Sequence, residues 1–188
     1  MTATYAVIFL NGAAPTPTQT AISSIRFRTD DNNTADLTNP CKIKNVLTRS
    51  FWKGVALQPN STFTQVSNFR HYCDGAIGWT LGTLGKLKRG NRDSGDNGCP
   101  LGSYVQATGV VNSSGDNMDT NHTYYSSQTV KSVNIQGDTS SSPALIDSTP
   151  ITVAGTLCKH IVMQVEVDID AVQGVQGTET LSWLVDEI

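Results

Sequence analysis

Hydrophobic and polar residues alternate most regularly between Lys159 and Asp170, in the stretch KHIVMQVEVDID. Apolar side chains occupy every second position from 161 to 169, and mostly polar side chains lie between them. A period of two places alternate side chains on opposite faces of a β-strand. The pattern therefore predicts a half-buried strand, with one apolar face on a core and a polar face toward water.

A second alternating segment, TETLSWLVDEI, covers residues 178–188 and follows a Gly- and Gln-rich connection. Leu181, Trp183 and Val185 fall on one face of the predicted strand, and Ser182 and Asp186 on the other. We expect the two strands to pair or to face each other across a core.

The N-terminal stretch contains an apolar run, residues 5–10, followed by Asn-Gly and a loop with two prolines. This order predicts a first strand and a turn. The run is too short to span a membrane and no positive residue precedes it, so we expect neither a membrane anchor nor a secretory leader. Two alternatives remain for residues 1–20: the strand pairs within its own chain, or it is an arm exchanged with or added to a partner. In the second case Tyr5, Val7 and Phe9 would contact the partner.

Shorter alternating segments recur along the chain and are separated by stretches rich in Gly, Asn, Asp and Ser, which favour turns. The predicted short strands are residues 21–29, 51–58, 67–73, 103–111, 129–137 and 149–155. The best helical candidate, residues 40–50, is weak. About eight to ten strands predict an all-β fold: one antiparallel, jelly-roll-like β-sandwich over residues 1–188, with long polar loops.

The composition agrees with this class, because only 15% of residues are charged, against roughly 25% in an ordinary domain. The net charge is −3. Basic residues cluster only at Lys86, Lys88, Arg89 and Arg92, within a Gly-rich stretch that we interpret as a solvated loop. We therefore predict no nucleic-acid partner.

The stretch SNFRHYCDG, residues 67–75, has the residue types of a metal site. In a strand, Phe69, His71 and Cys73 share one face. His71-x-Cys73 and Cys158-x-His160 could each chelate one ion, and together they would form a zinc site with two cysteines and two histidines.

The four cysteines leave two further alternatives. They could form two disulfides, for which three pairings exist, or remain free buried thiols. Without a leader peptide the free thiols are favoured, and we predict no bound metal or other cofactor. Paired aspartates in the loops also fit calcium, but we interpret them by default as solvated turn residues. The cysteines are Cys41, Cys73, Cys99 and Cys158.

No catalytic motif is present in the sequence. The serines lie in no G-x-S-x-G setting, and there is neither a P-loop nor a dinucleotide-binding fingerprint. We therefore predict that the protein is not an enzyme. Trp52 and Trp79 lie beside glycines and are the aromatic candidates for partner binding, with a place in the core as the alternative.

Three fragments, SNFRHYCDG, SYVQATG and TETLSWLVDEI, resemble small β-rich proteins of phage and virus-like gene sets. The group that they resemble is the viral capsid decoration, or cement, proteins. The resemblance implies a virion structural protein on the capsid surface that binds the major capsid protein or other copies of itself, with a trimer favoured. It implies no catalytic residue.

The alternative is an extracellular β-sandwich module. A carbohydrate-binding module would use Trp52, Trp79, Tyr124 or Tyr125 as a platform for sugars, and a filament subunit would donate residues 2–10 to the next copy.

Overall fold

The computed structural model describes residues 3–36, 38–75, 78–174 and 176–188, and it is built from antiparallel sheets. Within this part of the chain there are twelve strands and two short helical turns. Their bounds are β1 Thr4–Asn11, β2 Thr18–Ile22, β3 Thr48–Arg49, β4 Lys53–Asn60, β5 Val66–Cys73, β6 Lys86–Gly90, η1 Leu101–Ser103, β7 Gly109–Val110, β8 Ser114–Gly115, α1 Met118–Asn121, β9 Ser132–Asn134, β10 Ala144–Asp147, β11 Ile161–Val167 and β12 Leu181–Glu187.

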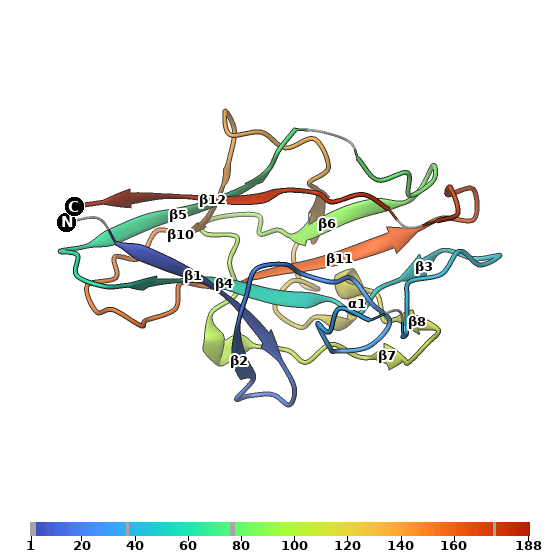
Figure 1. The fold of residues 1–188 in the computed structure, drawn as a ribbon, viewed down its shortest axis with the longest axis horizontal. Coiled ribbons are helices and arrows are strands. Elements are labelled where there is room, and N and C mark those ends of the chain that lie inside the picture. Colours follow the sequence, from blue (N-terminus) through green and yellow to red (C-terminus); the bar gives the residue numbers. More distant parts are fainter. Residues whose placement is uncertain (1–2, 37, 76–77, 175) are drawn as a thin grey trace.

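The strands form two unequal layers (Figure 1). The large sheet has the order β2-β1-β4-β11-β6-β9, and β3 pairs with the far end of β11. The small sheet has the order β10-β5-β12, while β7 and β8 form a separate ribbon. The predicted all-β antiparallel sandwich is confirmed. The strands in excess of the predicted number are segments of two or three residues.

The main core lies between the two layers. Met163 and Val165 of β11 pack with Val55 of β4 and Leu87 of β6, and the side chains of Leu181 and Trp183 close over them from β12. Strands β11 and β12 thus face each other across a core, one of the two arrangements expected from their alternation. In β5, Phe69, His71 and Cys73 are all buried on one face, as predicted.

The second face of β11 is also buried, which contradicts the predicted half-buried strand at residues 161–169. All seven residues of β11 are buried. The long connection between β6 and β9 folds back over this face, where Val162 packs with Met118 and Tyr125. Gln164 is fully buried because its amide bonds to main-chain groups of Ser50, Asp116 and Met118.

Several local predictions were wrong. The basic stretch at residues 86–92, interpreted as a solvated loop, contains β6, in which Lys88 and Arg89 are buried. The segment 23–29, predicted as a strand, is irregular apart from a bridge at Arg28, because it lines the opening between the layers. Residues 103–111 and 149–155 carry only short paired segments, and no helix forms within the described residues of 40–50.

Strand β1 pairs with β4 over residues 4–10 on one side and with β2 over residues 7–11 on the other, so most of both edges is occupied. Of the two alternatives for the N-terminal residues, the structure shows pairing within the chain. The start of β1 and the end of β12 lie side by side (Figure 1), where the Ala3 backbone N–H donates to Glu187 at 2.6 Å. Within the described residues, no helix has the length and apolar character needed to cross a membrane.

Candidate functional site

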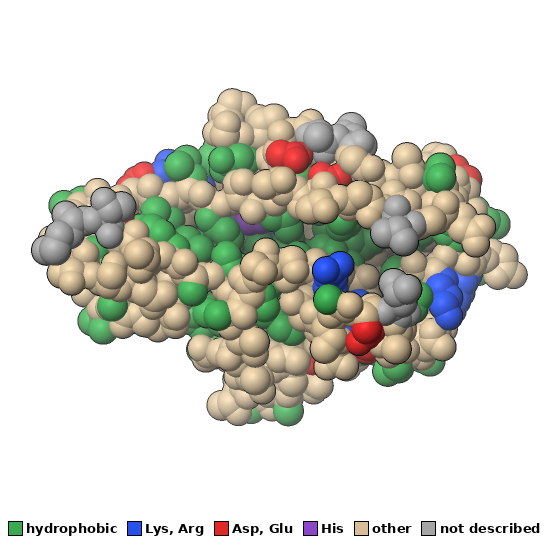
Figure 2. Space-filling model, in the orientation of Figure 1, with side chains coloured by type: hydrophobic (Ala, Val, Ile, Leu, Met, Phe, Trp, Pro, Cys, Tyr) green, Lys and Arg blue, Asp and Glu red, His purple; other side chains and the backbone are tan. Residues whose placement is uncertain are grey.

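A groove of about 560 Å³ opens between the two layers. Apolar side chains line it from both sheets, and Figure 2 shows the hydrophobic surface running along the long axis of the molecule. The residues that line its inner walls are Val7, Val55, His71, Ile161, Met163, Val165, Leu181 and Trp183. Its mouth is bordered by residues 22–28 and 176–179.

The groove exists because the layers differ in width. Six strands of the large sheet face only three strands of the small sheet, and β12 is the edge strand of the small sheet. One edge of β12 pairs with β5, and no strand pairs with its other edge within the described residues. The groove lies along this second edge, on the side that faces β1 (Figures 1 and 2).

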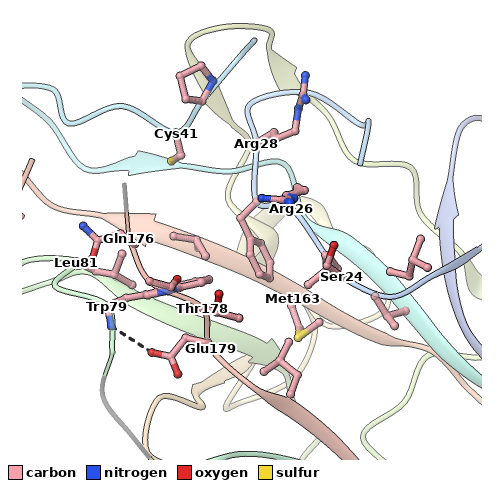
Figure 3. Close-up of a pocket in the computed structure, with 18 of the residues that line it drawn as sticks. Ser24, Arg26, Arg28, Cys41, Trp79, Leu81, Met163, Gln176, Thr178 and Glu179 are labelled. Carbon is pink, nitrogen blue, oxygen red and sulfur yellow. Dashed lines mark hydrogen bonds between the residues drawn. The ribbon is translucent and has the colours of Figure 1, made fainter. Parts of the chain in front are cut away.

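Hydrogen bonds hold both ends of β12. At its C-terminal end, beyond the residues that line the groove, Glu187 accepts bonds from the Ala3 backbone at 2.6 Å and from the Tyr5 hydroxyl at 3.0 Å. At the other end Glu179 accepts the Trp79 backbone N–H at 3.1 Å, and the Trp79 indole donates to the Gly177 carbonyl at 2.6 Å. Figure 3 shows this second closure, with Met163 deeper in the groove. The opening is therefore held by fixed contacts at both ends of β12.

The mouth carries charged groups of both signs. Arg28 is buried and bonds to Asp30 and, at 2.7 Å, to Asp36. Hydrogen bonds from Thr38 hold the pKa of the exposed Asp36 carboxyl well below its usual range. Arg26 is exposed beside them, so the rim offers polar contacts around an apolar interior.

His71 forms part of the inner wall and packs edge-on against Trp183, with ring centroids 5.3 Å apart. Burial, assisted by the nearby positive charge of Arg89, lowers the pKa of His71 to about 3. The imidazole is therefore neutral at ordinary pH, and the wall that it forms behaves as an uncharged surface.

The structure does not bring the predicted zinc ligands together. His71 and Cys73 lie on β5 of the small sheet, whereas Cys158 and His160 precede β11 of the large sheet. Among the described residues, the one group of three potential ligands within 4.8 Å of one another is Cys73, Asp74 and Glu179. All four cysteines are free thiols, and burial raises the pKa of Cys41, Cys99 and Cys158 to about 12.

Most of the loop aspartates considered for calcium bond to protein donors. Asp93 accepts the backbone N–H groups of Thr129 and Val130, Asp96 pairs with Lys159, and Asp170 accepts from Thr83. These contacts hold loops to the sheets.

The predicted partner-binding residues fall in three environments. Val7 lines the groove, and Trp79 borders it, stacked edge-on against Phe27. Tyr5 bonds to Glu187 outside the groove lining, with 36% of its surface exposed. Phe9 and Trp52 are core residues with 2% and 3% exposure, and the Trp52 indole donates to the Val105 carbonyl.

Sequence patterns missed the edge position of β12 and the contribution of residues 22–28 and 176–179 to the groove. The alternation of Ile25 and Phe27 signalled an apolar face, but it indicated a strand where the structure has an irregular rim. Comparison with family models, with curated proteins and with solved structures gives no match. The groove and the free edge of β12 are therefore the features from which a function can be inferred.

Proposed function

We propose that this chain is a non-catalytic structural protein of a virion, a capsid decoration component that binds a neighbouring capsid subunit through the groove beside β12. The observation that carries the proposal is the apolar groove along an unpaired strand edge. An edge of this kind presents free backbone donors and acceptors, and it readily accepts one more strand.

A strand added by a partner would use both features of the site, the unpaired edge of β12 and the apolar groove. Its backbone would pair with β12 and extend the small sheet from three strands to four. Its alternate side chains would enter the groove and cover Val7, Met163 and Trp183. Strand β12 has seven residues, so the inserted segment would pair over at most about that length.

The occupant that we propose is an extended apolar segment of a different protein, the capsid subunit. Strand β1 is paired on both edges, and β12 is the strand that forms the groove. The chain ends described in the structure are thus already engaged and do not supply a strand to a neighbouring copy. A homo-oligomer, with a trimer favoured, remains a separate prediction, which native mass spectrometry would test.

The extracellular alternative receives less support. Trp52 and Tyr125 are buried, so they do not form an exposed aromatic platform for sugars. The first strand is integrated into the large sheet, so donation of residues 2–10 to another copy would require its removal from between two partners.

The test is co-sedimentation in density gradients with particles purified from cells that express the gene. Wild-type protein is expected in the particle fraction. Ile25→Asp, which places a charge at the groove mouth, is expected to move the protein to the free fraction without unfolding it. The matched control is Val110→Asp, at a residue that is 68% exposed on β7 and does not line the groove.

Wild-type protein that stays free of particles would contradict the capsid role. Equal retention of both variants on particles would contradict the groove as the binding surface. Circular dichroism of each variant would confirm that the fold is retained.

A further inference from the structure

Lys88 lies in the middle of β6, and its side chain is completely buried. Its amino group contacts three oxygen atoms from different parts of the chain: Asn117 Oδ1 at 2.8 Å, Glu166 Oε1 at 2.9 Å and Asp119 Oδ2 at 3.0 Å. A nucleophile, a carboxamide and two potential proton acceptors therefore meet at one buried point. None of these residues lines the groove.

The carboxamide is held in place for attack. Asn117 precedes α1 as its N-cap, and its Oδ1 also accepts the Asp119 backbone N–H at 3.1 Å. A donor on this oxygen polarises the carbonyl and stabilises the negative charge that develops when a nucleophile adds to the carbon. The fixed contact between Nζ and Oδ1 keeps the amine beside that carbon, which replaces a bimolecular encounter.

Glu166 supplies the base. Burial raises its pKa, but the hydrogen bonds from Lys88 and Arg49 outweigh burial, so the net pKa is lowered and the group is ionised. Transfer of one proton from the ammonium to a carboxylate removes two charges from a buried site, where separated charges are costly. The amine that results is the nucleophilic form of lysine.

We propose that Lys88 and Asn117 join in an intramolecular isopeptide bond. The carboxylate of Glu166 takes a proton from the Lys88 ammonium, and the neutral Nζ attacks Cγ of Asn117. The new Nζ–Cγ bond forms as the Cγ–Nδ2 bond breaks. The leaving nitrogen receives the proton from Glu166 and departs as ammonia. The Glu166 carboxylate then takes the second proton of the amine as the amide forms and passes it to the ammonia, which leaves as ammonium. The carboxylate is regenerated, and no oxidant or external reactant is consumed.

This chemistry needs only one turnover per molecule, so a slow reaction in the folded protein is sufficient. The bond would connect β6 to the segment that covers the second face of β11. Lys53 provides a comparison within the chain. It is also fully buried, but its Nζ donates to the main-chain carbonyls of Asp30 and Asn32, which carry no displaceable amino group.

The test is the intact mass of the purified full-length protein, measured under denaturing and reducing conditions at isotopic resolution. The expected result is a loss of about 17 Da from the mass calculated from the sequence. Tryptic digestion is expected to give a branched peptide, residues 87–89 joined to residues 93–131, because trypsin does not cleave after an acylated lysine. The peptide that contains Lys53 should be unmodified, as an internal control.

A mass equal to that of the sequence, with residues 93–131 released as a linear peptide, would overturn the proposal. A loss of about 18 Da, with the branch at Asp119, would overturn the assignment to Asn117. Glu166→Gln retains the lysine and the amide but removes the base, and it is expected to restore the full mass. The wild-type measurement decides the question even if that variant does not fold. The outcome is independent of groove binding, which involves other residues.

Discussion

Strand β11 is buried on both faces, and the two faces are covered in different ways. Ile161, Met163 and Val165 face the small sheet and line a groove that remains partly open. Gln164 and Glu166 face the long connection between β6 and β9, where hydrogen bonds and ion pairs fill the space. Both faces of β11 itself are buried, but the apolar side lines the groove whereas the polar side is sealed. The buried polar groups on one face already have their partners within the chain, whereas the apolar surface of the groove is available for binding.

The largest loss of stability is expected from Glu166→Ala, on the sealed face of β11. The substitution removes the carboxylate that Arg49 and Lys88 share, and it leaves Asp119 as the remaining carboxylate beside the buried Lys88. Loss of one member of such a pair costs about 3–5 kcal/mol of unfolding free energy. Urea denaturation would measure it, with Asp186→Ala as the control, since that residue pairs with Arg70 at the surface. Equal stability of the two variants would show that the sealed face contributes no more than a surface ion pair.

For each buried histidine taken singly, an effect of intermediate size is expected from acid. Burial lowers the pKa of His71 and His160 to about 3 and that of His122 to about 4, against 6.5 for the ordinary group. The unfolded chain then binds more protons, so stability is complete above pH 6.5 and is lost as the pH falls toward the folded pKa values. At pH 5 each of the three histidines is expected to have removed about 2 kcal/mol.

Urea denaturation between pH 8 and pH 5 would measure this loss. His122→Phe keeps an aromatic ring beside Trp52 and Tyr125 but does not titrate. It should therefore reduce the pH dependence by about one third. An unchanged pH dependence in this variant would contradict burial of a neutral His122.

The smallest loss of stability is expected from a substitution in the groove. Leu87 is fully buried in the main core, so Leu87→Ala should cost about 2–5 kcal/mol. Leu181 lines the open groove and is only partly buried, so Leu181→Ala should cost about 1–2 kcal/mol. Thermal unfolding of the pair would compare the two sites. A larger loss at Leu181 would mean that the groove is as tightly packed as the core.

Period-two patterns correctly predicted those strands that pack one apolar face against a core. The shared face of Phe69, His71 and Cys73 was correct because burial alone determines it. The same reasoning failed for β6 and for the second face of β11, since it assigns charged residues to solvent. Their partners are distant in sequence, as Glu166 and Arg49 show with 117 positions between them, and no local window contains both residues. The groove escaped prediction for a related reason: it depends on which strand lies at the edge of a sheet.

The adjacent chain ends determine how the molecule would respond to a pulling force. Tension between the two ends would act on the contact between Ala3 and Glu187 and then on the ends of β1 and β12. The ladder bonds of each strand would break one after another, starting from that end of the molecule, so each step would involve only a few hydrogen bonds of modest net strength. Such a protein would yield at low force when pulled by its termini. A force transmitted by a strand bound in the groove would instead act along β12. All the hydrogen bonds between β12 and β5 would share it.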